Sequence, residues 1–275
     1  MRLNPMKTSK ASAAKARRGV RGSWMNSESL RWTASLSAFF AVWYGVIWLF
    51  QFPEYVLPTP SAVAQILWRD AALLLDHALM TLFETVIGLS LALVIGVLVA
   101  LVLHASRIAR YLTYPHLVLL QAIPLIAVAP IVLVWFGFGP LAKIVVVAFV
   151  CFFPIAVNAF EGFRSVDPSY RELLDTFDAS LWARYRHLYI PASVPGILSG
   201  AKIAATYSVL GAVIGEWLGG SRGIGVYMTR AQRSFRNDRL FAAIVIVMVM
   251  SLGLFKIVES AGDWMTPWMR RKRYE

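Results

Sequence analysis

Acidic residues and cysteine are both scarce in this chain. Its 275 residues include 15 Asp and Glu against 27 Lys and Arg, and the only cysteine is Cys151. A single cysteine excludes an intrachain disulfide and leaves the redox compartment open. Because Cys151 falls within a long apolar run, we expect it to be a small packed core residue.

Patterns that bind nucleotides or metals are also missing. The chain contains no G-x-x-x-x-G-K-[ST] sequence, so it is not expected to cradle nucleotide phosphates itself. The four histidines are scattered along the sequence: His77, His104, His116 and His187. Because metal sites need clustered ligands, we expect no metal and no cofactor on this chain. His77 is expected to be a capping or interfacial residue.

The net charge of +12 does not indicate a nucleic-acid partner, because many of the basic residues lie at the two ends. Eight Lys and Arg residues precede Thr33, and four more occupy positions 270–273. Basic segments favour the cytoplasmic side of a membrane, so both termini are expected to be cytoplasmic. The N-terminal tail is expected to be disordered and to touch anionic membrane lipids. Its first 22 residues lack the apolar core of a secretory signal peptide.

Long hydrophobic runs fill most of the chain between these ends. The chain is 58% hydrophobic with a mean hydropathy of +0.62, against about 45–50% apolar residues in soluble domains. Roughly 20 apolar residues span a bilayer as a helix. Six stretches are candidates: Thr33–Gln51, Leu79–Leu103, Leu112–Phe136, Leu141–Phe160, Ile197–Leu218 and Leu240–Gly262. We predict an all-α integral membrane bundle of about six transmembrane helices over residues 33–262, basic cytoplasmic tails at 1–32 and 263–275, and no separate soluble domain.

The third apolar stretch contains Pro115, Pro124 and Pro130, so its helix is expected to be kinked. Carbonyl groups freed by such breaks must face protein or a water-filled cavity rather than lipid, which favours a pathway-lining role. Gln121 lies about nine residues into this stretch, near the middle of the membrane. We predict that Gln121 and Pro124 line the path of a transported substrate.

Two acidic residues, Glu84 and Glu216, lie near the outer ends of their stretches in this topology. They are candidates for the mouth of the pathway, and pairing with outer-loop arginines or a place among lipid headgroups explains them as well. The outer loop 219–239 carries five arginines against one aspartate and could meet an acidic partner. Residues 61–76 are expected to form an amphipathic helix on the outer surface.

A polar, amphipathic segment over residues 168–195 separates the fourth and fifth stretches. Asp167 is a predicted N-cap, with Pro168 at the first helical position. Apolar side chains then recur at helical spacing in two groups, which are Tyr170, Leu173, Leu174 and Phe177, then Leu181, Tyr185 and Leu188. Pro191 and Pro195 are expected to end the second helix. Helices of about ten residues are marginal alone in water, so the segment must pack against something.

This segment resembles the EAA loop of ABC importer permeases, which reads Glu-Ala-Ala, three residues, Gly, nine residues and Ile-x-Leu-Pro. Glu172, Leu173 and Leu174 hold its first positions, and Pro191 closes the pattern at the right spacing. Asp178 stands where the glycine belongs. Asp tolerates left-handed turn geometry, so a turn between the two helices is still expected.

The resemblance extends over about residues 57–268, including the segments Gln121–Pro124, Trp135–Gly139 and Val166–Pro168. It implies a permease of the nitrate, sulfonate, taurine and thiamine-precursor branch, in the bacterial cytoplasmic (inner) membrane. Glu84 and residues 211–217 most resemble permeases for the pyrimidine precursor of thiamine. Aliphatic sulfonate, taurine, nitrate and riboflavin are the alternative substrates.

The resemblance also implies partners. A second permease copy completes a homodimer, a cytoplasmic ATPase dimer carrying ATP and Mg grips the EAA loop, and an extracytoplasmic solute-binding protein delivers the substrate. The chain itself is then not an enzyme. The residues expected to couple to the ATPase are Glu172, Leu173, Leu174, Phe177, Asp178, Trp182, Tyr185, Leu188 and Pro191.

Two other classes of membrane protein are alternatives. An ion-coupled secondary transporter would need an acidic or basic relay near the membrane midplane, and the deep parts of the six stretches offer only Gln121. An integral membrane enzyme would need a cluster of His, Asp, Glu or Cys, and the sequence suggests none.

Overall fold

The computed structural model of the protein describes residues 30–267; residues 1–29 and 268–275, which hold most of the predicted basic tails, lie outside the described part. Within residues 30–267 the chain is helical and has no β-strand, which confirms the predicted all-α fold. The helices are Leu30–Phe50, α2 (Pro60–Arg69), α3 (Ala71–Ala105), α4 (Arg107–Leu120), α5 (Leu125–Phe136), α6 (Pro140–Arg164), α7 (Pro168–Thr176), α8 (Leu181–Arg184), the π-helical turn η1 (Tyr185–Tyr189), α9 (Ile190–Gly219), α10 (Ile224–Arg233) and α11 (Asn237–Met265).

Five helices of the described part are long and apolar enough to cross a membrane. They are Leu30–Phe50, α3, α6, the helix from Leu181 to Gly219, and α11. α4 and α5 meet the same requirement only as a pair, which is bent by 106° at a short break. Counted as one broken span, the pair brings the number to six, as the hydrophobic runs predict.

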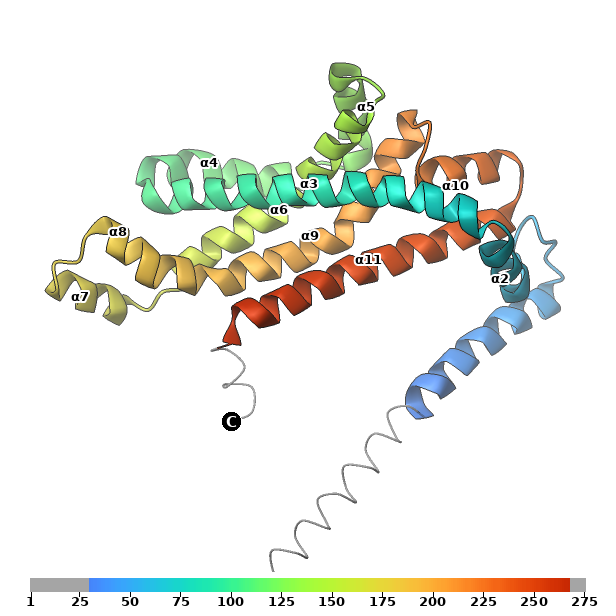
Figure 1. Cartoon of the computed structure of the whole chain (residues 1–275), viewed down its shortest axis with the longest axis horizontal. Helices are drawn as coiled ribbons and strands as arrows, with labels where there is room; N and C mark the ends of the chain where they lie inside the picture. Colours follow the sequence, from blue (N-terminus) through green and yellow to red (C-terminus); the bar gives the residue numbers. More distant parts are fainter. Residues whose placement is uncertain (1–29, 268–275) are drawn as a thin grey trace, which may run out of the picture.

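The body of the molecule consists of α3, α6, α9 and α11, which run side by side (Figure 1). The core shared by α3, α6 and α9 contains small and branched side chains, including the fully buried Cys151, as predicted. α6 and α9 approach closely where Gly196 faces α6. A Cβ atom on Gly196 would lie 2.5 Å from the carbonyl oxygen of Asn158. Such contacts between small residues are typical of helix pairs in membranes.

The predicted kink in the third span is confirmed, and it is a complete break that separates two helices, α4 and α5. Residues 121–124 are not helical, and Pro124 precedes α5 in an extended conformation. Pro115 and Pro130 stay inside α4 and α5. The break therefore lies at Pro124, where the ring restricts the preceding residue and the extended backbone turns the chain.

The prediction that Pro191 and Pro195 end a second short helix is wrong. One continuous helix runs from Leu181 through the π-helical turn η1 and α9 to Gly219. The wider π-helical turn of η1 immediately precedes Pro191, and this local change in the hydrogen-bond pattern lets the helix continue past a residue that lacks a backbone N–H. The second half of the 168–195 segment is thus the start of the fifth span.

The two ends of the bundle carry different short helices. α7 and α8 lie at one end, and α2 and α10 lie at the other (Figure 1). The Thr59 side chain caps α2, which ends at Arg69 and is shorter than the predicted helix over residues 61–76. Asp70 follows, and α3 begins directly after it.

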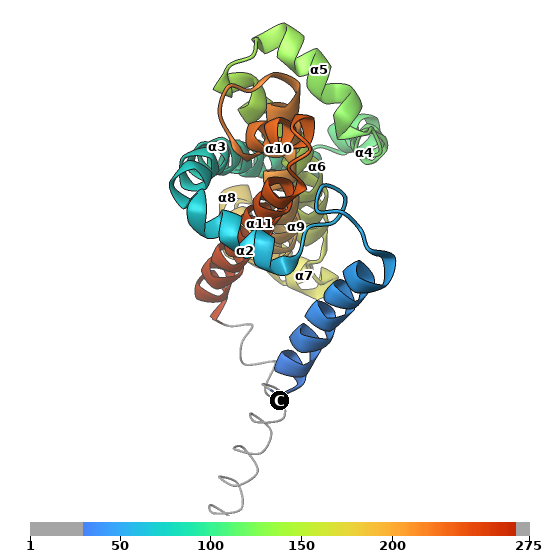
Figure 2. The same ribbon diagram turned by 90° about the vertical axis from the view of Figure 1, so that its right-hand side faces the viewer.

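The helix Leu30–Phe50 stands apart from the bundle in both views (Figure 1 and Figure 2). The most apolar part of this helix is not buried by the rest of the chain. Trp43 provides a contact: its ring lies 5.7 Å from that of Phe241, and its Nε1 donates a hydrogen bond to the carbonyl oxygen of Pro58. This helix is therefore an appendage with a small interface.

Candidate functional site

The segment over residues 168–195 forms a hairpin of two helices at one end of the bundle. Asp167 caps α7, as predicted: its carboxylate accepts hydrogen bonds from the Ser169 backbone N–H at 2.9 Å and from the Ser169 hydroxyl at 2.7 Å. These bonds hold the pKa of Asp167 below its usual value. Pro168 occupies the first helical position. The entry to α7 is thus fixed by its own sequence.

The turn between α7 and α8 has the geometry that the EAA pattern requires. Asp178 has a φ of +47°, in the left-handed region that glycine usually occupies. Arg184 braces the turn, because its Nε donates to the carbonyl oxygen of Ala179 at 2.8 Å and its guanidinium pairs with Asp175. Asp178 therefore adopts the turn although the EAA pattern has glycine at this position.

Several large apolar side chains of this hairpin are open to solvent. Phe177 is 73% exposed, Leu181 75% and Trp182 61%. Glu172, Leu173 and Asp178 are exposed beside them, whereas Leu174, Tyr185, Leu188 and Pro191 are half-buried. Of the nine predicted coupling residues, five are therefore exposed and the other four are partly covered by the rest of the chain.

A second feature is an open cavity of about 450 Å³ beside the break between α4 and α5. Gln121 lines it, together with Phe149 and Phe153 of α6 and Tyr207 of α9. The other lining residues are Leu120, Ile123, Leu125, Val150, Pro154 and Ile203. None of the lining residues is charged, so the cavity suits a neutral ligand with an apolar body and few polar groups. Pro124 forms the break but does not line this cavity.

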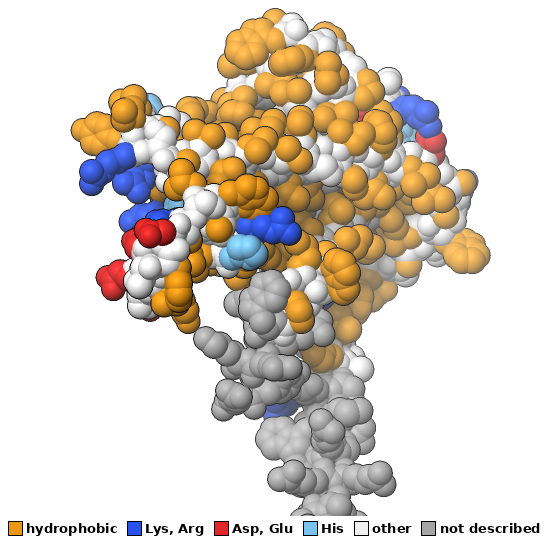
Figure 3. All heavy atoms as spheres, turned by 60° about the vertical axis from the view of Figure 1, so that its left-hand side comes forward, with side chains coloured by type: hydrophobic (Ala, Val, Ile, Leu, Met, Phe, Trp, Pro, Cys, Tyr) orange, Lys and Arg blue, Asp and Glu red, His pale blue; other side chains and the backbone are white. Residues whose placement is uncertain are grey.

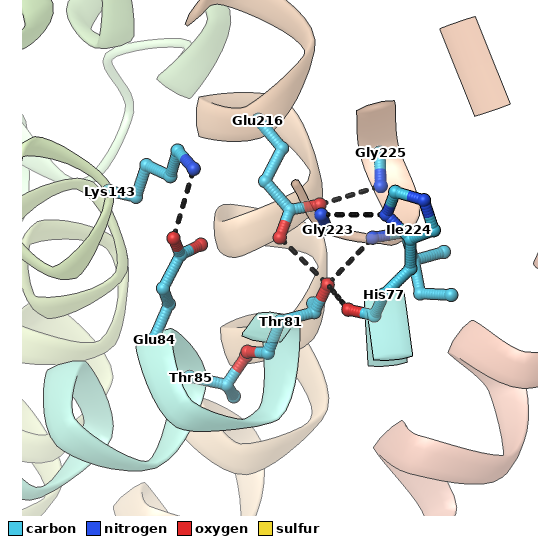
Figure 4. A network of polar contacts seen from close by, with 9 residues as sticks. All are labelled: His77, Thr81, Glu84, Thr85, Lys143, Glu216, Gly223, Ile224 and Gly225. Atoms are coloured by element: carbon cyan, nitrogen blue, oxygen red, sulfur yellow. Dashed lines mark hydrogen bonds and ion pairs between the residues drawn. The ribbon is translucent and has the colours of Figure 1, made fainter. Parts of the chain in front are cut away.

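Glu84 and Glu216 belong to a third feature, a buried polar network (Figure 4). Glu84 is fully buried and accepts a hydrogen bond from Lys143 Nζ at 3.0 Å. Glu216 is 1% exposed, and its Oε1 accepts from the Thr81 hydroxyl at 2.7 Å. The network joins α3, α6 and α9 inside the bundle.

The same network holds the start of α10. Three successive backbone N–H groups donate to side chains: Gly223 to His77 Nδ1 at 3.0 Å, Ile224 to Thr81 Oγ1 at 2.8 Å, and Gly225 to Glu216 Oε2 at 2.6 Å. The first N–H groups of a helix have no partner within the helix, so these bonds satisfy them. His77 is thus the capping residue that the sequence predicts.

The expectations for Glu84 and Glu216 need correction. Neither lies at an open mouth, pairs with an outer-loop arginine or reaches lipid headgroups, because both carboxylates are buried in the network. Lys143, the fourth residue of α6, is not among the predicted site residues although it is only 2% exposed. A lysine inside an apolar stretch was the available signal, because such a charge needs a buried partner.

The comparison with protein families decides the identity of the chain. A family described as "Binding-protein-dependent transport system inner membrane component" matches residues 92–271. The chain belongs to this family. The permease is accordingly a multi-pass protein of the inner membrane and a subunit of an ABC importer.

Relatives of the permease are themselves transport proteins. A probable ABC transporter permease protein of Haemophilus influenzae is 37% identical, covering 82% of this chain and 90% of its own. The formylaminopyrimidine transport permease protein ThiX of Halalkalibacterium halodurans is 33% identical, covering 79% and 88%. A solved amino acid ABC transporter is similar in fold, with a TM-score of 0.59 at 18% identity over 71% of this chain and 95% of that one.

Proposed function

We propose that this permease carries a small, flat heteroaromatic nutrient into the cell, with a pyrimidine precursor of thiamine as the best candidate. Two copies form the membrane part of the importer, and an extracytoplasmic solute-binding protein delivers the substrate to the end that carries α2 and α10. A cytoplasmic ATPase dimer with ATP and Mg binds the α7–α8 end, on the same side of the membrane as the two basic tails. The relative described as a formylaminopyrimidine transport permease supports this substrate class.

The exposed apolar hairpin at α7 and α8 is the observation that carries the proposal. Phe177, Leu181 and Trp182 are each more than half exposed at the end of the bundle, on a segment that matches the EAA spacing. An apolar knob on a helix suits insertion into a groove of a soluble partner. The motion of that partner can then be passed to the continuous helix that begins at Leu181.

Co-purification with the ATPase tests this coupling. Trp182→Ala should reduce the affinity for the ATPase by about thirtyfold, since buried aromatic anchors often contribute about 2 kcal/mol or more at an interface. Trp68→Ala is the matched control, because Trp68 is 87% exposed on α2 at the opposite end. Equal retention by both variants would remove the hairpin from the interface, and ATP-independent uptake driven by an ion gradient would favour a secondary transporter instead.

The cavity beside Gln121 supports the substrate class. Its aromatic and aliphatic lining fits a flat ring, and the Gln121 amide can both donate and accept, as a pyrimidine requires. Sulfonate, taurine and nitrate each carry a negative charge that no lining residue offsets. Riboflavin, which also has a flat ring system, remains the stronger alternative.

Uptake into proteoliposomes that contain the whole importer tests the cavity. Gln121→Ala should lower uptake of a hydroxymethyl- or formyl-aminopyrimidine at least tenfold while ATP hydrolysis continues, because the polar contact is lost and the coupling hairpin is intact. Ser90→Ala is the control, because Ser90 is an exposed polar residue of α3 that does not line the cavity. Normal uptake by Gln121→Ala would exclude this cavity from the pathway.

A further inference from the structure

A second cavity, of about 480 Å³, lies at the α7–α8 end and is lined mainly by polar atoms. It lies where α3 ends, α4 begins, α6 ends and the coupling hairpin folds back. Basic side chains gather at this end of the molecule (Figure 3). The lining residues are His104, Arg110, Arg164, Arg171, Leu181, Arg184, Tyr185 and Tyr189.

The four arginines of this cavity are only partly neutralised. Arg164 Nη1 lies 3.4 Å from Glu161, and Arg184 pairs with Asp175. Arg110 and Arg171 have no carboxylate within salt-bridge distance among residues 30–267. Two positive charges thus face the cavity without a counter-charge from the described part of the chain.

Arg171 also has an unused hydrogen-bond donor. Its Nη2 donates to the carbonyl oxygen of Val166 at 3.2 Å, and its guanidinium lies 6.0 Å above the Tyr189 ring, which fixes the orientation of the group. Its Nε is buried and has no acceptor. A buried donor without a partner costs free energy, and a charged donor costs more than a neutral one.

Neutral polar groups complete the lining. His104 Nδ1 lies 3.0 Å from the Tyr185 hydroxyl, and the His104 ring makes edge-to-face contacts with the rings of Tyr185 and Tyr189. A hydroxyl can rotate to donate to a ligand. The cavity therefore presents guanidinium and hydroxyl donors from several directions.

We propose that this cavity binds a phosphate dianion, either free inorganic phosphate or the phosphomonoester head of a lipid such as phosphatidic acid. Two unpaired guanidinium groups match a charge of about −2, and a phosphate accepts bonds from donors that converge from different helices. The bound anion would join α4 to the coupling hairpin through Arg110 and Arg171. Binding does not depend on the ATPase; only an effect of the anion on ATP hydrolysis rests on the proposed function.

The test uses the full-length permease in nanodiscs of phosphatidylcholine. Inorganic phosphate is titrated and binding is followed by calorimetry, and native mass spectrometry measures retention of phosphatidic acid when it is added to the nanodiscs. Arg110→Gln should weaken whichever ligand binds by about tenfold, the loss expected for one charge-assisted hydrogen bond. Arg171→Gln should do the same.

Arg107→Gln is the matched control, because Arg107 is exposed on the first turn of α4 and does not line the cavity. It should leave binding unchanged. Phosphate binding in pure phosphatidylcholine assigns the free anion, and retention of phosphatidic acid without phosphate binding assigns the lipid. Binding of neither ligand, or equal weakening by Arg107→Gln and Arg110→Gln, overturns the proposal. Thermal unfolding of each variant in detergent confirms that it is folded.

Discussion

Lys143 of α6 and Glu84 of α3 form a buried ion pair between two helices of the bundle. The charge of Lys143 lies inside an apolar helix and is compensated by Glu84 at 3.0 Å, and both side chains are almost completely buried. The second oxygen of Glu84, Oε2, has no hydrogen-bond partner. Removing Lys143 would therefore leave a buried carboxylate without its cation, which is far more costly than losing an exposed ion pair.

Lys143→Met is expected to lower the free energy of unfolding by about 3–5 kcal/mol, because it leaves Glu84 without its cation. The double variant Lys143→Met, Glu84→Met should recover most of that loss, since an apolar pair of similar volume needs no compensation. Unfolding in mixed detergent and SDS measures both. Lys256→Met provides the comparison: this lysine is 70% exposed beside Glu259, and its loss should cost no more than about 1 kcal/mol. A double variant as unstable as the single one would contradict this role.

The contacts of individual residues could be predicted from the sequence only in part. The cap at Asp167 and the turn at Asp178 could be predicted, because they depend on residues within a few positions of one another. The network of Thr81, Glu84, Lys143 and Glu216 could not, since its members come from three helices. Hydropathy shows that a charge is inside a span but does not show which partner faces it.

The short distance between helices α6 and α9 depends on the absence of a side chain at Gly196. Gly196 faces backbone atoms of α6, with Asn158 O 2.5 Å and Gly162 Cα 2.8 Å from the position of an added Cβ. Backbone atoms cannot rotate out of the way as a side chain can. The two helices would have to separate to admit even a methyl group.

Gly196→Ala should therefore destabilise the permease by about 1–3 kcal/mol, the usual cost of overpacking, despite the better helix propensity of alanine. Gly253→Ala in α11 meets nothing within 4 Å and should stabilise the protein by up to about 1 kcal/mol. Thermal unfolding in detergent measures both changes. If the two substitutions shift the midpoint in the same direction, the close approach of α6 and α9 does not limit stability.

Helix ends were less predictable than helix positions. Each apolar run corresponds to an observed helix or helix pair, because burial in a membrane requires it. The sequence predicts that Pro191 ends a helix, since proline usually breaks a helix interior. The structure keeps the helix by placing η1 directly before Pro191. Only the local backbone geometry, which the sequence pattern does not specify, distinguishes these two outcomes.

The whole molecule combines a tightly packed bundle with one loosely attached helix. The hydrophobic run at residues 33–51 predicts a span that packs into the bundle like the others. In the structure, Leu30–Phe50 is attached chiefly through Trp43. One hydrogen bond and one aromatic contact contribute roughly 2 kcal/mol. Separation of this helix should leave the bundle folded.

A protease site inserted between Phe52 and Pro53 tests this, because cleavage after purification does not disturb insertion into the membrane. The cleaved bundle should keep its free energy of unfolding within about 2 kcal/mol and elute without the N-terminal fragment. A site inserted in the loop at residues 220–222 is the control. Its fragments should stay together, since α10 remains bound through His77, Thr81 and Glu216. Unfolding after the first cleavage would show that the helix supports the bundle.

The unbroken helix from Leu181 to Gly219 connects the two ends of the permease as a single rod. Its 39 residues extend about 58 Å, and the glycine contact with α6 near Gly196 lies roughly 21 Å from Trp182 and 30 Å from Glu216. Further close contacts at Gly200, Gly211 and Gly215 hold this rod against α6 over most of its length, so the two helices should move as one body. Force applied at Trp182 would thus reach Glu216, and with it the first turn of α10. Spin labels at Arg186 and Leu218, each paired with a reference on α6, should therefore keep their distances when ATP binds, and a change in either distance would show that α9 moves independently of α6.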